Sequence, residues 1–378
     1  MIKRVLNLLV KLATGVYVRQ NPTKIERIGK DWNPPADLKS ILVFSTTALG
    51  DTLLSTPAIA SLKKSFPAAR LTLFVHRAMA PLFEGLESVD DIVLYHGGFR
   101  RFIGTVLALR KARPEAALLF HSNAPQDIPM AVLSGARIIL KPPTTSEYRH
   151  YLSHQFAPKA QHVVEERLDL VRLLGGKQLT TRLCLPARFG EPRKGFITQL
   201  REGARKIIGF QPGAANKFKM WPTENFAALA DRLAQRLEDI EIVITGSRKE
   251  PLLAQKIIDL CTTRHIHNLC GKYDLEELPF LVREFDLLVS NDTGTMHLAI
   301  ALGVPTLCLF GPTSAELIGP YQDLDRHRVI QIRGESIAGI PKKKRTDSTM
   351  RLITVDEVFQ AVLEMLGRQN TENREHAG

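Results

Sequence analysis

The sequence contains no run of about 18 apolar residues, so we expect no helix that spans a membrane. It has only four cysteines, with no CxxC pair or other metal-ligand spacing among them. This pattern speaks against a zinc or iron–sulfur motif and favours buried, reduced thiols in a cytosolic protein. Aromatic residues make up only 7% of the chain, and no recognised nucleic-acid-binding motif occurs. We therefore expect no nucleic-acid partner.

Two motifs of other enzyme classes are also missing. The first predicted strand is followed by "TTALGDT", which is not the G-x-G-x-x-G turn that a nicotinamide-dependent oxidoreductase needs. No DxD-type pair of carboxylates follows a strand end. We therefore expect neither a resident metal nor another cofactor.

The chain does have length and positive charge. Its 378 residues are too many for one ordinary core and predict two domains of similar size. It carries 51 Lys and Arg residues against 39 Asp and Glu residues, a formal net charge of +12 at pH 7. This balance favours acidic partners, namely nucleic acid, an anionic membrane or phosphorylated small molecules. Charge alone does not choose among them.

Predicted strands and helices alternate in two separate stretches of the chain. Strands such as "ILVFST" and "RLTLFV" in the first half, and "EIVITGS" and "DLLVSND" in the second, are separated by segments with helical spacing. This order predicts an α/β protein with two doubly wound, Rossmann-like domains. The predicted parts are an amino-terminal segment 1–38, a first domain 39–186, a linker 187–204, a second domain 205–350, a helix 351–367 and a disordered tail 368–378.

The amino-terminal segment begins with "MIKRVLNLLVKLATGVYV", which predicts an amphipathic helix. Its apolar side comprises Ile2, Val5, Leu8, Leu9, Leu12, Ala13 and Val16. Its polar and basic side comprises Lys3, Arg4, Asn7, Lys11 and Thr14. A basic amphipathic helix can lie in a membrane interface. The alternative is a helix that packs its apolar side on the protein itself.

Ligands of open parallel sheets bind outside the carboxyl ends of the strands. Five loops with glycine or polar residues follow predicted strands, and they come from both halves of the chain. We therefore expect a cleft between two facing domains.

The loop "NDTGTMH" predicts a site for a diphosphate. Gly294 has no Cβ, so backbone N–H groups can approach an anion at the start of the following helix. Thr293 and Thr295 add hydroxyl donors, and His297 in the first turn can donate to a phosphate oxygen. The alternative is that Asp292 or Thr293 only caps the helix and that His297 is a surface residue.

The loop "PGAANKFKMW" carries Lys219 together with Gly213 and Asn216. The compact charge of a lysine suits a diphosphate, although a loop lysine can also be a solvated surface charge. Glu250, after another strand, can accept a hydrogen bond from a ribose hydroxyl or lie on an exposed helix.

Asp51 follows Gly50 at the end of the first strand. A carboxylate at the start of a helix stays ionised, as a general base must. The alternative is that Asp51 caps that helix.

Four stretches resemble glycosyltransferase family nine, the lipopolysaccharide heptosyltransferases. They are "STTALGDTLLSTPAIASLKKSFP", "HVVEERLDLVRLLG", "PGAANKFKMWPTENFAALADRL" and "SNDTGTMHLAIALGVPTLCLFGPT". The resemblance covers most of residues 39–365. It implies a GT-B fold and an inverting, metal-independent transfer from ADP-L-glycero-β-D-manno-heptose to the inner core of lipopolysaccharide, at the cytoplasmic face of the inner membrane.

By motif position, the resemblance also implies residue roles. Asp51 matches the proposed catalytic base, with Gly50 beside it on the acceptor side, and Lys219 matches a lysine that contacts the donor phosphate. The phosphate and sugar contacts of the second domain match Asp292, Thr293, Gly294 and His297.

Two features depart from the family pattern. Many relatives carry cysteines before the last helix, where "GIPKKKRTDSTMRLIT" is basic instead, and the amino-terminal extension of about 38 residues exceeds that of the shortest members. Three alternatives stay open: a GT-B transferase that uses another nucleotide sugar, a sugar-nucleotide epimerase and a non-catalytic envelope-assembly protein.

Overall fold

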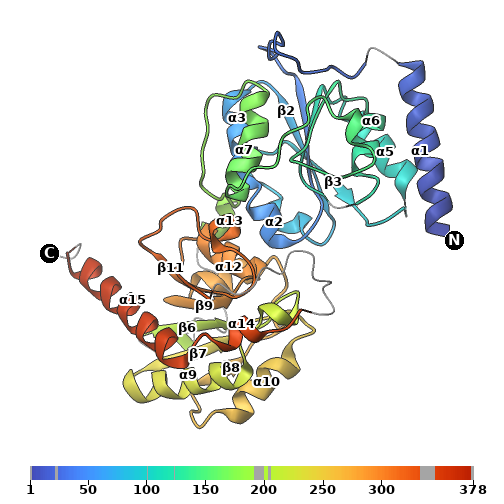
Figure 1. Ribbon diagram of the computed structural model, residues 1–378. Coiled ribbons are helices and arrows are strands. Elements are labelled where there is room, and N and C mark those ends of the chain that lie inside the picture. The colour runs from blue at the N-terminus through green and yellow to red at the C-terminus, as the bar shows by residue number, and fades with distance from the viewer. Residues whose placement is uncertain are drawn as a thin grey trace. The chain divides into compact units, whose positions relative to one another are not determined.

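The computed structural model describes residues 2–21, 24–99, 101–122, 124–190, 200–202, 206–332 and 345–375. The chain divides into two compact units, Met1–Pro186 and Ala187–Gly378, which we call unit 1 and unit 2 (Figure 1). Residues 339–344 of the basic stretch before the last helix and most of the predicted linker lie outside the described residues.

Unit 1 is built on a five-stranded parallel sheet with the order β3-β2-β1-β4-β5. The strands are β1 (Ser40–Ser45), β2 (Arg70–His76), β3 (Asp91–Tyr95), β4 (Ala116–His121) and β5 (Ile138–Leu140). β1 and β4 are central and consist almost entirely of buried residues. This is why they appear in the sequence as continuous runs of apolar residues.

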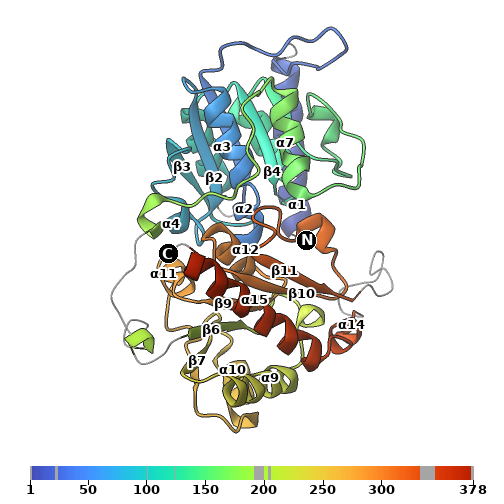
Figure 2. The same cartoon turned by 90° about the vertical axis from the view of Figure 1, so that its left-hand side faces the viewer.

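Helices cover both faces of this sheet. They are α1 (Ile2–Gln20), α2 (Leu49–Leu53), α3 (Thr56–Ser65), α4 (Ala80–Phe83), α5 (Phe102–Lys111), α6 (Asp127–Ser134), the 3₁₀ turn η1 (Arg149–Tyr151) and α7 (Val163–Leu173). α3 and α7 pack together on one face, and α5 and α6 lie on the other, with α1 outside α6 (Figures 1 and 2). The single helix expected after β1 is divided into α2 and α3, because Pro57 in the first turn of α3 starts a new helix.

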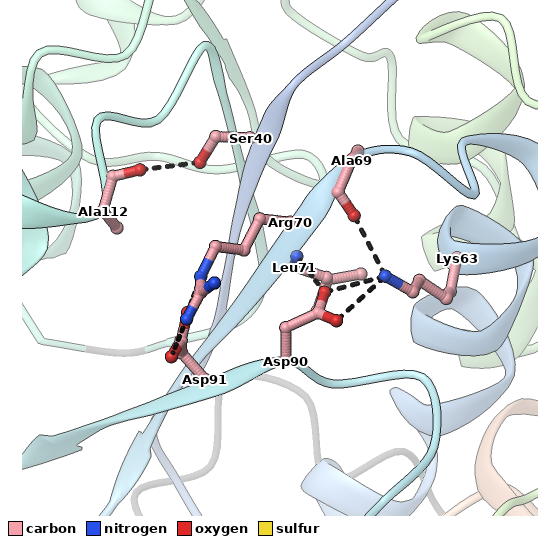
Figure 3. Close-up of polar contacts among 8 residues, drawn as sticks. All are labelled: Ser40, Lys63, Ala69, Arg70, Leu71, Asp90, Asp91 and Ala112. Carbon is pink, nitrogen blue, oxygen red and sulfur yellow. Dashed lines mark hydrogen bonds and ion pairs between the residues drawn. The ribbon is translucent and has the colours of Figure 1, made fainter.

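The polar contacts at the starting ends of the strands hold unit 1 together, away from the carboxyl ends where ligands bind. The Asp90 carboxylate accepts hydrogen bonds from the Leu71 backbone N–H (2.7 Å) and from Lys63 Nζ (2.8 Å), which joins α3 to β2 (Figure 3). Arg70, at the start of β2, forms a bidentate ion pair with Asp91, at the start of β3.

The structure decides which side of α1 packs on the protein. The helix packs near α6 through a side on which Val10 and Thr14 are buried, and this side lies outside the predicted apolar side. Lys11 on this side pairs with Glu147 (2.9 Å). The apolar side faces outward, and Leu8 and Leu12 are each 56% exposed. The expectation that the apolar side packs on the protein is therefore wrong.

Unit 2 contains a six-stranded parallel sheet with the order β11-β10-β9-β6-β7-β8. The strands are β6 (Lys206–Gln211), β7 (Ile240–Ile244), β8 (Ile266–Asn268), β9 (Leu287–Asn291), β10 (Thr306–Phe310) and β11 (His327–Gln331). The four central strands match the predicted ones. The sequence did not predict β8 and β11 in unit 2, or β5 in unit 1, and all three are edge strands.

The helices of unit 2 are η2 (Ala187–Gly190), η3 (Lys217–Lys219), α9 (Thr223–Arg236), α10 (Pro251–Leu260), α11 (Leu278–Arg283), α12 (Gly294–Ala301), α13 (Ala315–Ile318), α14 (Ser348–Arg351) and α15 (Val355–Glu375). One face of the sheet forms a core with α9, α10 and α15. Thr354 caps the start of α15, because its hydroxyl accepts a hydrogen bond from Glu357 N (3.2 Å). The helix continues beyond the predicted boundary at Gly367 to Glu375.

The two doubly wound halves expected from the alternation of strands and helices are thus present. Among the helices of the described residues, none combines the length and the apolar character needed to cross a bilayer.

Candidate functional site

A hydrogen-bonded cluster lies at the carboxyl ends of β1 and β4 in unit 1. The two strands are neighbours, and Ser45 pairs with His121 in the sheet. Thr47 Oγ1 lies 2.9 Å from Asp51 Oδ2 and 2.6 Å from His121 Nδ1. His121 Nε2 lies 3.5 Å from Asp51 Oδ1. The sheet therefore brings together Thr47, Asp51 and His121, which are up to 74 positions apart in the chain.

Asp51 lies within α2 and does not cap it, because the cap position is Ala48. The capping alternative for Asp51 is therefore wrong. Its side chain is about one-third exposed, so a ligand can reach the carboxylate. Gly50, just before it, is buried.

A buried cation lies beneath this cluster. Arg167 of α7 is fully buried, and its Nη1 donates to the backbone oxygen of Asp51 (2.8 Å). Among the described residues, none offers an acceptor to its Nε or Nη2. Burial lowers the pKa of Arg167 to about 10, with attraction to Asp51 and Glu166 acting the other way. The side chain therefore remains charged at neutral pH.

The same surroundings keep His121 neutral. Burial lowers the pKa of the imidazole, and the positive charges of Arg167 and Lys141 lower it further, against an opposite effect of Asp51. A neutral histidine at pH 7 can accept a proton.

A cavity of about 560 Å³ opens beside His121. Its polar lining includes Ser122, Asp127, Lys141, Glu147, Glu166 and His121. Lys141 donates to Asp127 (2.7 Å) and to Ser122, and both members of this ion pair are nearly buried. Burial also raises the pKa of Glu166. The cavity has the size of a small-molecule site, and its hydroxyls and carboxylates can bind a ligand rich in hydroxyl groups.

Five residues of this part of unit 1 were not predicted from the sequence: Thr47, His121, Asp127, Lys141 and Arg167. His121 could have been selected from the sequence, because it is the last residue of a predicted strand and ligands bind at the carboxyl ends of strands. The signal for Arg167 was weaker: it is a charged residue whose neighbours one helical turn away are apolar.

A second cluster lies at the carboxyl ends of β6 and β9 in unit 2. Lys219 Nζ lies 2.5 Å from Asp292 Oδ2, and Thr313 Oγ1 donates to the same oxygen (2.7 Å). The Asp292 side chain is 6% exposed and that of Lys219 is 19% exposed. Lys219 is thus part of a largely buried ion pair, and the alternative of a solvated surface charge is wrong.

Asn291, which the sequence analysis also missed, joins the two loops of this cluster. Its Nδ2 donates to Pro212 O (2.7 Å), and its Oδ1 accepts from Trp221 N (3.1 Å). The loop after β6 is therefore bonded at both of its ends to the last residue of β9. This explains why Lys219 and Asp292 meet across 73 positions of sequence.

Thr293 caps the start of α12, which was one of the two alternatives predicted for this loop. Thr293 is the cap residue, and its hydroxyl accepts from Thr295 N (3.1 Å). Gly294 is the first residue of the helix. His297 is only 4% exposed, so the alternative of a surface residue is wrong. Capping by Thr293 leaves the first backbone N–H groups of an eight-residue helix beside the Asp292 loop.

The remaining predicted residues lie around Glu250. This residue precedes α10, and its Oε2 accepts from Ser247 N (2.6 Å). A Cβ on Gly213 would lie 1.7 Å from Glu250 Oε1, so only glycine allows the carboxylate to lie over this loop. Asn216 accepts a backbone bond from Lys219 N (3.0 Å) and so starts the turn that carries the lysine.

Comparisons with known proteins agree with this arrangement. "Lipopolysaccharide heptosyltransferase 2" of Salmonella typhimurium is 26% identical over an alignment of 356 residues that covers 86% of this chain and 97% of that protein. The solved structure of "E. coli ADP-heptose lps heptosyltransferase II" is similar with a TM-score of 0.71 at 23% identity, covering 88% of this chain and 99% of the other. An E. coli heptosyltransferase solved with ADP-2-deoxy-2-fluoro heptose has a TM-score of 0.65 at 20% identity, covering 86% and 99%.

At these identities the solved structures establish the fold, and the two parallel-sheet units form a GT-B protein. The family model described as glycosyltransferase family 9 (heptosyltransferase) matches residues 145–349, which is more than half of the chain. The protein therefore belongs to glycosyltransferase family 9, the heptosyltransferase family, and is a glycosyltransferase.

Proposed function

We propose that the protein transfers a heptose from ADP-heptose to the inner core of lipopolysaccharide, with inversion at the sugar carbon and without a metal. The observation that carries this proposal is the cluster of Lys219, Asp292 and Thr313 beside the start of α12. It combines a cation with the backbone N–H groups at the start of a helix, which is the chemistry that binds a diphosphate. The family and the named relatives support heptose as the transferred sugar.

The donor site of unit 2 follows from this geometry. The first N–H groups of α12 and the hydroxyls of Thr293 and Thr295 donate to phosphate oxygens, with His297 in the first turn. Lys219 adds positive charge, and Asp292 holds the lysine in place and faces the sugar. Gly213 and Asn216 shape the loop beneath the nucleotide, and Glu250 accepts from a ribose hydroxyl.

The acceptor site lies in unit 1, where Asp51 is the base and Gly50 adjoins it. A sugar in the cavity beside His121 would present a hydroxyl toward Asp51. The carboxylate removes the hydroxyl proton while the oxygen attacks the anomeric carbon from the side opposite ADP. The bond to the ADP oxygen breaks, and the leaving group carries away its electron pair. Positive groups at the diphosphate stabilise that growing charge, which is usually the largest contribution to catalysis.

A lipid-linked acceptor also explains the amino-terminal helix. α1 contains no acidic residue and four basic ones, and the apolar side chains of Val5, Leu8, Leu9, Leu12 and Val16 are each at least half exposed. An exposed apolar stripe on a basic helix binds an anionic membrane surface. We therefore place the enzyme in the cytoplasm, peripherally bound to the inner membrane through α1.

The function is tested by incubating the full chain with ADP-heptose and a panel of truncated core lipopolysaccharides and measuring product masses. The expected result is the addition of one heptose to one member of the panel. Addition of another sugar from a different nucleotide donor would overturn the choice of donor. Isomerisation of the nucleotide sugar without any acceptor would instead indicate an epimerase.

A further inference from the structure

We propose that His121 is the second member of the proton-accepting unit of this enzyme. It takes over from Asp51 the proton that leaves the acceptor hydroxyl, and Thr47 sets its tautomer. This inference rests on the proposed function. Because His121 acts through Asp51 and not on the substrate, it is a positioning and relay residue.

The tautomer follows from counting hydrogens. An ionised carboxylate only accepts, so the single hydroxyl hydrogen of Thr47 must point to Asp51 Oδ2. The 2.6 Å contact between Thr47 Oγ1 and His121 Nδ1 then requires the hydrogen to be on Nδ1. The neutral ring therefore has its lone pair on Nε2, the nitrogen that faces Asp51 Oδ1 at 3.5 Å.

This arrangement leaves one place for one proton between the ring and the carboxylate. Before reaction, a lone pair and an anionic oxygen face each other at a distance longer than a good hydrogen bond. Once Asp51 Oδ1 carries a proton, it donates to Nε2, and the two atoms can approach. Catalytic hydrogen bonds often tighten in this way only when the reaction proceeds.

The proton can be followed through one turnover. The acceptor O–H bond breaks as the new bond to the sugar carbon forms, and the proton goes to Asp51. Transfer to His121 Nε2 gives an imidazolium and restores the carboxylate. The ring is 27% exposed, so the imidazolium can release the proton to solvent. No other reactant is needed.

The charges around the ring favour this role. Asp51 on α2, Arg167 on α7 and Lys141 after β5 act on His121, and Glu166 lies across the same cavity. Burial, Arg167 and Lys141 lower the pKa of the ring below its ordinary value of 6.5, against Asp51. The ring is thus a neutral acceptor at pH 7. As the pH falls through that lowered pKa, the ring is already protonated before the reaction starts. It can then no longer accept the proton from Asp51, and turnover should fall.

Two variants separate the relay from a structural role. His121→Asn keeps a donor at the Nδ1 position toward Thr47 but has nothing at Nε2, and His121→Gln places an amide near Nε2 that cannot take up a proton. His76→Asn is the matched control, because His76 ends strand β2 of the same sheet, is also partly buried and has a pKa lowered mainly by burial.

We expect both His121 variants to lower kcat by at least about tenfold, within the range of general acid–base effects. KM for both substrates and ADP affinity by calorimetry should stay near the wild-type values. The acid limb of the wild-type pH–rate profile should shift in both variants, because Asp51 alone then sets it, and His76→Asn should leave it in place.

Wild-type kcat in either variant would overturn the relay. So would a lower kcat with an unchanged acid limb, or losses confined to KM and melting temperature, because these indicate a structural role. If the wild-type enzyme itself transfers no heptose, the proposed function fails instead, so the two failures are distinguishable.

Discussion

The buried ion pair between Lys219 and Asp292 yields a prediction for stability as well as for binding. The lysine Nζ and the carboxylate Oδ2 are 2.5 Å apart, and both side chains are largely removed from water. Lys219→Met leaves a buried carboxylate whose remaining side-chain partner among the described residues is Thr313. Asp292→Asn leaves a buried ammonium. The double variant removes both charges.

The magnitude follows from this burial. Removing one partner of a buried pair typically costs about 3–5 kcal/mol, because the remaining charge loses its compensation. Since Lys219 keeps some exposure and Thr313 remains bonded to Asp292, we expect about 3 kcal/mol for each single variant. The double variant should cost less than the sum of the two, with a coupling of about 2–3 kcal/mol.

ADP affinity should respond differently from stability. Losing the lysine removes a charge-assisted contact to phosphate, which should weaken ADP binding by about 1–3 kcal/mol. This loss should appear in Lys219→Met and again in the double variant, even though the double variant recovers stability. The two measurements therefore separate the structural role of the pair from its role in binding.

The assay is chemical denaturation of the full chain with and without ADP. The transition that ADP moves to higher denaturant concentration reports on the part of the protein that binds it. Calorimetry gives ADP affinity for the same four proteins. Additive stability losses, or unchanged ADP affinity in Lys219→Met, would refute the reasoning.

Three further predictions concern other parts of the molecule. Asp51→Asn should reduce turnover by about 10²–10⁴-fold and preserve ADP binding; near-normal turnover would show that Asp51 is not the base. The double change Leu8→Gln and Leu12→Gln should abolish salt-sensitive binding to anionic liposomes without changing the melting temperature. The control Val10→Gln, on the buried side of α1, should instead lower the melting temperature. Liposome binding that survives the double change would reject α1 as a membrane-binding surface. Transfer should persist in EDTA because Lys219 and the α12 amides supply the positive charge; loss of activity that one divalent ion restores would contradict this.

Much of the architecture could be predicted from local patterns. Central strands such as β1 and β9 are buried on both faces, so they appear in the sequence as runs of apolar residues. In the intervening helices, apolar residues recur with the helical period. Edge strands lack that signal. β11, for example, has the mixed sequence "HRVIQ" with exposed Arg328 and Val329, and it becomes a strand only because β10 offers it a partner.

The candidate site was predictable in part for a similar reason. In a parallel sheet, residues just after strands gather at one edge, so Asp51, Lys219 and Asp292 could be selected from position alone. Which of them touch could not be predicted. Lys219 and Asp292 form an ion pair because β6 and β9 are neighbours in the sheet, although six helices and strands separate these two strands in the chain.

The sequence by itself therefore determined the alternation of elements, the two domains and the strand ends that carry polar groups, since each depends on neighbouring residues. Only the tertiary structure decided that His121 meets Thr47 and Asp51, because strand order sets contacts between distant residues. It also decided which side of α1 faces the protein. A helical wheel shows that two sides differ, but the surface available for packing is created by α6 and its neighbours.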